Sequence, residues 1–529
     1  MSHAGQAAPP TPSAMPGAPP PALELRDIDK HFGAVHANRA VSLVVRRGSI
    51  HGIVGENGAG KSTLMRIVYG FYQPDAGLIH VDGAPRRFRN PREAMQAGIG
   101  MVHQHFMLVA PFTVLENVVL GLGAGALLRP VLETARARLL EIEARYGLEV
   151  DIDARVCDLS VGERQRVEIL KALYRDARIL ILDEPTGVLT PQEAEALFAI
   201  LRGLRAQGRS VLLITHKLKE IMAVTDQVSV MRAGAMVAHR ATGDTSREEL
   251  AELMVGAKVA VPRNSGEGAA GPLMLSLEGV STAERTGGAS LSQVSLGVHA
   301  GEILGIAGVA GNGQSALMEA IAGMRSLSAG VIRLGAHVIA SADLRADPLK
   351  VRAAGIAHVP EDCQTSGLVA AMSAAENTML GHQANPRFYR HGLLDTAVLT
   401  ARAARHFADY DIRPRRPGQL AGAFSGGNQQ KIVLAREIEG DPAVLLVGQP
   451  TRGVDIGAVA AIHRRLLDLR ARGKAILLVS ADLDELLALA DRILVMFHGR
   501  IVGEARPGAV SEQELGLMMA GGAATGAAA

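Results

Sequence analysis

The chain has 529 residues, of which 48% are hydrophobic and 20% charged, and its formal net charge is +2. This length exceeds what one hydrophobic core supports, so two or three domains are expected. The near-neutral charge argues against nucleic acid or an acidic surface as a partner. The two cysteines form no CxxC pair, which argues against a disulfide scaffold and against a cysteine-rich zinc site.

Residues 1–22 are rich in proline and alanine, which predicts a disordered tail with extended character. The tail lacks the basic start and the apolar block of a signal peptide. No apolar run in the chain approaches the roughly 18 residues needed to cross a bilayer. The protein is therefore expected in a reducing cytosol, where it would meet a membrane only by docking on partners.

Apolar runs typical of strands alternate with helical patterns in the first half, residues 23–258. The runs IHGIVG at 50–55, ARILILDEP at 177–185 and SVLLITH at 210–216 are strand-like, whereas EAEALFAILRGLRAQ at 193–207 has helical spacing. This alternation predicts an α/β domain with a mostly parallel sheet.

GENGAGKS, at 55–62, fits the phosphate-binding pattern G-x-x-x-x-G-K-[ST]. It follows a predicted strand and precedes the helical pattern STLMRIVYG, a context that disfavours an accidental glycine-rich turn. Backbone N–H groups of such a loop surround phosphate oxygens at a helix N-terminus. Lys61 is expected to reach the β- and γ-phosphates, and the Ser62 hydroxyl to ligate Mg²⁺. The predicted nucleotide contacts are Gly55, Glu56, Asn57, Gly58, Ala59, Gly60, Lys61, Ser62 and Thr63.

Asp183 and Glu184 end the apolar run ARILILDEP. A carboxylate at the carboxyl end of a parallel strand faces the ligand crevice. We expect Asp183 to hold the Mg²⁺ shell and Glu184 to polarise the attacking water. A solvated acidic pair is common for these two residues taken alone, but the phosphate-binding loop makes it the weaker interpretation.

Together, GENGAGKS, Gln104, LSVGERQ at 159–165, DEP at 183–185 and the histidine of LLITHKL at 212–218 resemble the motifs of an ABC-transporter ATPase. The resemblance implies that Gln104 senses Mg²⁺ and the permease, and that His216 touches the γ-phosphate. It also implies that Phe32 stacks on the adenine. A lone glutamine or histidine would more often be structural, but the order and spacing favour these roles.

Segments of the first half recur, in the same order, in residues 274–522. The pairs include GENGAGKS with GVAGNGQS at 308–315, AGIGMVHQ at 97–104 with AGIAHVPE at 354–361, and LSVGERQR at 159–166 with FSGGNQQK at 424–431. The chain is therefore predicted to be a tandem duplication of P-loop NTPase (ABC ATPase) domains. A linker at 259–273 joins the two domains, and 523–529 form a short tail. The resemblance implies a sheet core and a helical subdomain in each.

The second half lacks the reactive residues of the first half. Gln314 replaces Lys61, Gly448 replaces Asp183, Gln449 replaces Glu184, Ala481 replaces His216 and Glu361 replaces Gln104. The glycines of GVAGNGQS remain, so a backbone cradle can survive. This second nucleotide site is predicted not to hydrolyse ATP.

The two signature segments differ in the opposite direction, because here the second half has the more complete motif. The first half has Val161 after its signature serine, where a side chain obstructs close backbone approach to phosphate, whereas the second half has two glycines. In the ABC family, each site combines the P-loop of one half with the signature of the other. By this resemblance, the first-half site is completed by Ser425, Gly426, Gly427, Asn428 and Gln429. In this family an aspartate usually follows the acidic strand. The second half has it as Asp455, whereas the first half has Thr190 at the corresponding position.

The fused, asymmetric layout resembles the double-ATPase subunit of importers for ribose, galactose and nucleosides. The segments at 100–121 and QPTRGVD at 449–455 are most similar to the nucleoside branch, with a monosaccharide as the alternative solute. The resemblance implies ATP and Mg²⁺ as cofactors, two permease subunits and an extracytoplasmic solute-binding protein as partners, and a peripheral position on the cytoplasmic face of the cell (inner) membrane. We expect residues 104–121 to dock on the permeases, with core packing as the alternative.

Soluble ABC ATPases that act on ribosomes or DNA form another class. Their translation-factor members typically keep two intact sites and a long charged linker, whereas this linker is short. The basic clusters at 86–89 and 413–416 are short and carry no interleaved aromatic residues. Import is therefore the favoured function.

Overall fold

The computed structural model divides into two compact units, Met1–Val259 and Ala260–Ala529, which are described separately. The described residues are 20–33, 35–103, 106–121, 129–186, 189, 191–258, 262–266, 271–283, 289–309, 311–344, 346–454, 456–519 and 521. Gln104, Thr190, Asp455 and most of the two predicted tails lie outside these residues.

Unit 1 contains an antiparallel sheet of order β2-β1-β4-β5 and a six-stranded sheet of order β10-β9-β3-β8-β7-β6. In the larger sheet β9, β3, β8, β7 and β6 run parallel, and only β10 pairs antiparallel. The strands are β1 (Leu23–Phe32), β2 (Val35–Val45), β3 (Ile50–Gly55), β4 (Ala76–Val81), β5 (Ala84–Arg86), β6 (Ile99–Val102), β7 (Ile179–Asp183), β8 (Ser210–Ile214), β9 (Gln227–Arg232) and β10 (Ala235–Ala241).

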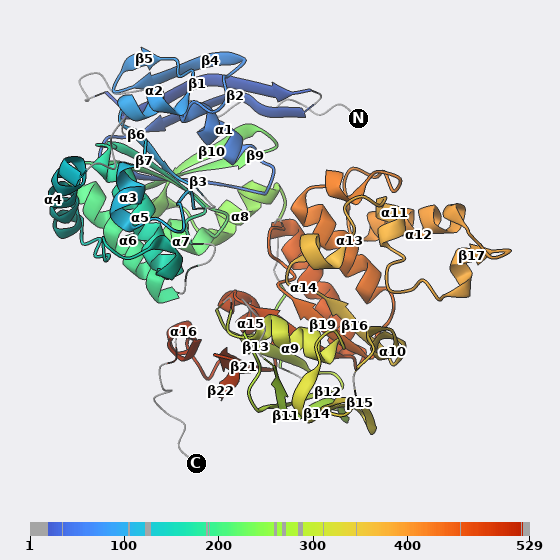
Figure 1. The fold of residues 1–529 in the computed structure, drawn as a ribbon. Coiled ribbons are helices and arrows are strands. Elements are labelled where there is room, and N and C mark those ends of the chain that lie inside the picture. The colour runs from blue at the N-terminus through green and yellow to red at the C-terminus, as the bar shows by residue number, and fades with distance from the viewer. Residues whose placement is uncertain are drawn as a thin grey trace. The chain divides into compact units, whose positions relative to one another are not determined.

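Three helices of unit 1 form a group of their own. Helices α3, α4 and α5 contact one another and form a helical subdomain, set apart from the antiparallel sheet (Figure 1). Helix α1 begins directly after the loop that follows β3. The helices are α1 (Lys61–Val68), α2 (Pro91–Gln96), α3 (Val114–Val119), α4 (Arg129–Tyr146), α5 (Val161–Tyr174), α6 (Pro191–Ala206), α7 (Leu218–Val224) and α8 (Arg247–Val255).

Unit 2 repeats this topology. Its antiparallel sheet has the order β12-β11-β14-β15 and its large sheet the order β16-β19-β20-β13-β21-β22, which corresponds to the order of unit 1 read from the other edge. The strands are β11 (Leu273–Thr282), β12 (Val294–His299), β13 (Ile303–Ala307), β14 (Leu327–Leu334), β15 (His337–Ser341), β16 (Ile356–Val359), β17 (Tyr389–Arg390), β18 (Leu393–Leu394), β19 (Val444–Gly448), β20 (Ala475–Ser480), β21 (Arg492–Phe497) and β22 (Arg500–Ala505).

Helices α11, α12 and α13 make up the helical subdomain of unit 2, and the hairpin β17–β18 lies at its outer end (Figure 1). The helices are α9 (Gln314–Ile321), α10 (Pro348–Ala353), α11 (Ala374–Asn377), α12 (Thr396–Asp409), α13 (Gly426–Ile438), α14 (Ile456–Ala471), α15 (Leu483–Leu489) and α16 (Glu512–Met519). The predicted tandem α/β architecture, with a mostly parallel sheet and a helical subdomain in each half, is confirmed.

The parallel sheet of unit 2 is buried on both faces, which is why its strands read as continuous apolar runs. Along β13, Ile303 and Ala307 belong to one hydrophobic cluster, while Leu304 and Ile306 belong to the cluster on the other face. This alternation follows from the two-residue period of a strand. The carboxyl ends of the strands are thereby fixed by cores on both sides.

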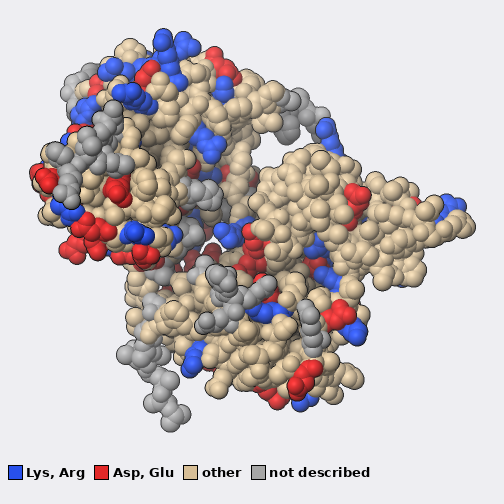
Figure 2. Space-filling model, in the orientation of Figure 1, with Lys and Arg blue, Asp and Glu red and all other residues tan. Residues whose placement is uncertain are grey.

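The surface shown in Figure 2 carries charged side chains of both signs, scattered over each unit, and on this face they form no continuous basic stripe. Within the described residues, no helix combines the length and apolar character needed to cross a membrane.

Candidate functional site

The predicted phosphate-binding loop of unit 1 joins β3 to α1, and its conformation depends on two glycines. Gly60 caps α1 in the left-handed conformation, with φ of 100°, and a Cβ there would lie 2.3 Å from the Ala37 carbonyl oxygen. A Cβ on Gly55 would lie 2.2 Å from the Met231 carbonyl oxygen. Only glycine fits either position, so the loop can keep its backbone curved around an anion at the start of the helix.

Lys61 lies 5% exposed under this loop. Its Nζ donates to the Gly55 carbonyl at 2.6 Å and to the Glu56 carbonyl at 3.0 Å. Burial lowers the pKa of Lys61, and the negative charges of Glu184, Asp183 and Glu56 oppose that shift. The ammonium group is therefore held beside the cradle by carbonyl oxygens rather than by a direct ion pair.

Ser62 and Asp183 meet because β3, β8 and β7 are neighbours in one parallel sheet. The Ser62 hydroxyl donates to Asp183 Oδ1 at 3.5 Å. Burial and the nearby Glu184 charge raise the pKa of Asp183, and the hydrogen bond from Ser62 partly offsets the rise. A hydroxyl and a carboxylate beside an anion cradle are the oxygen ligands that suit Mg²⁺ with a nucleotide, so these residues fit the predicted cofactors.

Glu184 follows β7, and its side chain lies 3.0 Å from the His216 ring, Oε1 to Nδ1. Burial alone would raise the pKa of Glu184, but the His216 hydrogen bond and the His216 and Lys61 charges outweigh it and lower that pKa. Glu184 has a left-handed backbone, with φ of 48°, and its N–H donates to the Ile214 carbonyl at 2.8 Å. The structure thus brings together Glu184 and His216, which are far apart in the sequence.

A buried carboxylate that sequence reasoning missed supports this pair. Glu220, on α7, accepts a hydrogen bond from the Thr186 hydroxyl and another from the Thr215 hydroxyl at 3.0 Å. Thr186 lies two residues after Glu184, and Thr215 immediately precedes His216. Glu220 therefore ties together the two segments that carry Glu184 and His216. An acidic residue in the first turn of a helix gave no signal in the sequence.

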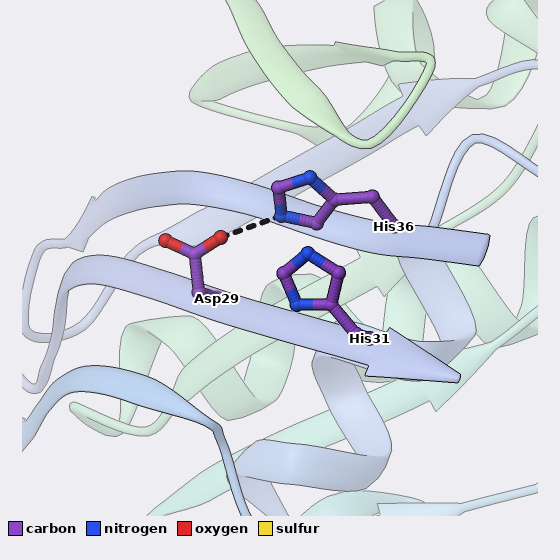
Figure 3. A group of neighbouring side chains, drawn as sticks. All are labelled: Asp29, His31 and His36. Carbon is purple, nitrogen blue, oxygen red and sulfur yellow. Dashed lines mark hydrogen bonds and ion pairs between the residues drawn. The ribbon is translucent and has the colours of Figure 1, made fainter. Parts of the chain in front are cut away.

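Phe32 lies at the end of β1, in a hairpin braced by three polar side chains (Figure 3). His36 Nε2 and Asp29 Oδ1 are 2.6 Å apart across the two strands, and the His31 and His36 rings stack with centroids 3.8 Å apart. The Phe32 ring is 42% exposed and meets the Tyr72 ring edge-on at 5.2 Å. An exposed aromatic face on a braced hairpin is compatible with the predicted adenine contact.

The signature serines have different surroundings. Ser160 caps α5 in a capping box: its hydroxyl accepts from the Glu163 N–H at 3.3 Å, and the Glu163 carboxylate accepts from the Ser160 N–H at 2.8 Å. Ser425 precedes α13 as its N-cap residue without a capping bond from its side chain, and its hydroxyl oxygen accepts from the Asn428 amide at 2.8 Å. Helix α13 starts with Gly426 and Gly427, so the backbone at its N-terminus carries no side chains.

Unit 2 keeps the backbone of the acidic strand but not its chemistry. Gln449 has φ of 47°, and its N–H donates to the Val479 carbonyl at 2.8 Å, as Glu184 does to Ile214. The side chain at this position is an amide, and Gly448 precedes it. The left-handed conformation therefore belongs to the strand-to-loop geometry in both units.

The segment after Gln104 is held against α5 by charged side chains. The Met107 N–H donates to Glu168 at 2.6 Å, and Lys171 donates to the Met107 carbonyl at 2.9 Å. A pocket of about 190 Å³ lies beside it, lined by residues that include Tyr69, Phe71, Met95 and Met107. Phe71 is 46% exposed and Met107 58% exposed, whereas α3 of the same segment is largely buried. The segment thus divides into an exposed apolar part and a core part.

Comparisons with known proteins agree with this geometry. A family model described as ABC transporter matches residues 38–187 and 291–452. The chain is 44% identical to the nucleoside import ATP-binding protein NupA of Lactococcus lactis, over 94% of this chain and 98% of that protein. It is 43% identical to the guanosine import ATP-binding protein NupO of Bacillus subtilis, over 94% and 97%. It is also 43% identical to the glucose import ATP-binding protein TsgD13 of Haloferax volcanii, over 95% and 96%.

Proposed function

This chain belongs to the ABC transporter family, and we propose from that membership that it is the ATP-hydrolysing subunit of an importer for nucleosides or related simple sugars. The observation that carries the proposal is the convergence in unit 1 of five side chains at the carboxyl ends of three neighbouring strands, β3, β7 and β8: Lys61, Ser62, Asp183, Glu184 and His216. Unit 2 keeps Ser315 at the position of Ser62 but lacks the other four side chains.

Within unit 1, the loop N–H groups and Lys61 bind the nucleotide phosphates, and Ser62, Asp183 and the predicted Gln104 hold Mg²⁺. Bound Mg²⁺ would neutralise phosphate charge and orient the terminal phosphoryl group. Phe32 offers its exposed ring to the adenine. Lys61 is held by two loop carbonyls and Asp183 accepts from the Ser62 hydroxyl, so both charged groups already lie beside the loop that would hold the phosphates.

Glu184 orients the attacking water, and the His216 hydrogen bond and charge, which outweigh burial, lower the pKa of this carboxylate and so favour its ionised form. His216 holds the Glu184 carboxylate in place and contributes to recognition of the γ-phosphate. Glu220 acts as a positioning residue, since it fixes the segments on which Glu184 and His216 lie. In unit 2 the corresponding site lacks the base, the lysine and the aspartate and does not hydrolyse ATP.

We infer that the signature of unit 2 completes the site of unit 1. Gly426 and Gly427 expose N–H groups at the N-terminus of α13, a place where backbone dipoles favour an anion. In unit 1, Val161 occupies the first position of α5 and the Ser160 hydroxyl already serves the capping box. The catalytic residues therefore lie in unit 1, whereas the signature with an unobstructed backbone lies in unit 2.

The solute is expected to be a nucleoside, with a monosaccharide as the alternative, because the named relatives include importers of both kinds. Vesicles that contain this chain, its two permeases and its extracytoplasmic binding protein should take up labelled nucleoside when ATP is supplied on the side of this chain. Uptake of ribose or glucose in its place would assign the sugar branch. ATP hydrolysis that no solute stimulates would contradict the importer function.

The two permeases are expected to contact the exposed part of the segment at 106–112 and the pocket beside it. Glu168 and Lys171 hold the Met107 backbone against α5, the helix that begins within the first signature. A partner helix seated on Phe71 and Met107 would therefore bear on both the Gln104 segment and the signature helix. This connection suits a subunit that must transmit ATP-driven changes to a membrane partner.

A charged residue in this pocket should uncouple the chain from its partners. Met107→Asp is expected to lower recovery of the chain with permease-containing membranes by tenfold or more, since burying an unpaired carboxylate at an apolar contact is costly. ATP hydrolysis by the purified chain should persist. Leu393→Asp, at an exposed hairpin of unit 2, is the matched control and should bind as the wild type does. Membrane recovery without permeases would refute docking through partners.

A further inference from the structure

The β1–β2 hairpin of unit 1 brings together three side chains that can ligate a metal ion (Figure 3). His31 on β1 and His36 on β2 are direct partners across the hairpin, and Asp29 lies two residues before His31. Each of the three offers one ligand atom, and these atoms all lie within 4.8 Å of one another. The cluster lies apart from Ser62 and Asp183, which are the residues expected to hold Mg²⁺.

The donor atoms of this cluster suit a transition metal. Two imidazoles and one carboxylate are typical ligands of Zn²⁺ and similar cations, whereas Mg²⁺ prefers oxygen ligands. Ligand atoms about 2.0–2.2 Å from a tetrahedral Zn²⁺ lie roughly 3.3 Å from one another. His36 Nε2 and Asp29 Oδ1 are 2.6 Å apart, so a small outward shift of these two atoms would admit the ion in place of their hydrogen bond.

Neighbouring groups orient two of the three ligands. Asp29 Oδ2 accepts from the Ala40 N–H at 3.3 Å, which leaves Oδ1 directed at His36. Asp75 Oδ2 lies 3.5 Å from His31 Nδ1 and accepts from the His31 N–H at 2.6 Å. A carboxylate beside one imidazole nitrogen commonly supports a histidine that binds metal through its other nitrogen. The Asp75 carboxylate can therefore hold the His31 ring with Nε2 left for the metal.

The cluster is open to solvent and adjoins the predicted adenine contact. The side chains of His31, His36 and Asp29 are 51%, 30% and 27% exposed, so an ion can reach all three. Phe32 directly follows His31, and it pairs across the hairpin with Val35. A metal bound by both strands would therefore fix the hairpin one residue pair away from the Phe32 ring.

We propose that Asp29, His31 and His36 bind a transition-metal cation of the Zn²⁺ class, and that the bound ion tightens nucleotide binding by unit 1. A ring that is already held in place loses less conformational entropy when the base binds. The metal site itself requires no nucleotide. The coupling rests on the nucleotide-binding function proposed above, because it requires Phe32 to contact the adenine.

The metal site is tested by calorimetric titration of Zn²⁺ into the full chain, free of any affinity tag and of nucleotide. Asp29→Asn, His31→Gln and His36→Gln should each weaken Zn²⁺ binding by at least the roughly tenfold that loss of a supporting partner costs. Asp29→Asn is the sharpest of these variants, since the amide keeps the size of the side chain and an oxygen that can accept from His36.

His337→Gln is the matched control, because it removes an exposed histidine from a strand of unit 2, β15. This variant should bind Zn²⁺ as the wild type does. No Zn²⁺ binding by the wild-type chain, or equal Zn²⁺ affinity in the wild type and all three cluster variants, would overturn the metal site.

The coupling is tested with labelled ATP and the full chain carrying Glu184→Gln, in excess Mg²⁺ with and without Zn²⁺. Zn²⁺ should tighten ATP binding by about fivefold or more, and adding Asp29→Asn should remove that gain. The Asp29→Asn arm also excludes Zn²⁺ acting at the Mg²⁺ position. Unchanged or weaker ATP binding in a chain that binds Zn²⁺ would overturn the coupling. A chain that binds Zn²⁺ but no ATP would instead contradict the proposed function.

Discussion

Glu184→Gln is expected to abolish steady-state ATP hydrolysis and to leave ATP binding intact. The substitution removes the carboxylate that orients water but keeps the size of the side chain. Loss of a general base or water-positioning group costs about a hundredfold to ten-thousandfold in rate. Hydrolysis is measured as released phosphate and binding as retained labelled ATP. Substantial turnover by this variant would exclude Glu184 as the residue that activates water.

The structure indicates that this variant should fold. Gln449 adopts nearly the same φ at the corresponding position of unit 2, 47° against 48°, and makes the same backbone hydrogen bond. A glutamine is therefore compatible with this strand-to-loop geometry. Gln449→Glu is the reciprocal control: it should not create a second hydrolytic site, because Gln314 and Gly448 remain. Lys61→Ala is expected to differ from Glu184→Gln by weakening ATP binding as well.

Ser425→Arg should abolish both ATP hydrolysis and transport, although Ser425 lies in the unit without catalytic residues. A hydroxyl and the adjacent N–H groups stabilise developing charge on the γ-phosphate. Removing such a group costs roughly a hundredfold or more in kcat, and arginine adds steric obstruction next to Gly426 and Gly427. The measurement is kcat of the reconstituted transporter. Full activity in this variant would contradict a site completed by the signature of unit 2.

Ser160→Arg is the matched variant, and we expect it to affect stability more than hydrolysis. Its hydroxyl accepts from the Glu163 N–H in the capping box of α5, so its loss should lower the free energy of unfolding by about 1 kcal/mol. Hydrolysis should fall less than in Ser425→Arg, since the site that Ser160 would serve lacks lysine, aspartate and base. Equal or reversed sensitivity of the two serines would break the composite-site model.

The strained backbone at Glu184 illustrates why catalytic function should not be assigned from geometry alone. A left-handed non-glycine residue is often a mark of an active site. Here the same conformation persists at Gln449, where the catalytic carboxylate is absent. The conformation follows from how the sheet edge turns into the next loop, and the first unit places a carboxylate on it.

The amino-acid sequence by itself determined the duplication, the α/β class and the motifs. Short motifs were readable because their residues act through neighbours along the chain: GENGAGKS forms one loop, and the apolar run before Asp183 forms one buried strand. The repeated order of those segments predicted a repeated sheet topology, which the two six-stranded sheets confirm. The asymmetry between the halves was equally visible, since it consists of single substitutions at aligned positions.

Only the tertiary structure decided which distant side chains cooperate. Glu220 joins Thr186 to Thr215, and Glu361 reaches Ser315, because parallel strands bring separate loops to one edge of a sheet. In the alignment Glu361 stands where Gln104 stands, yet its Cγ lies in the space left at Gly448. The spacing of residues along the sequence cannot reveal that a side chain from one strand end occupies the space beside a glycine of another. Whether a side chain fills a vacant position depends on packing between strands and on the volume that the smaller residue leaves.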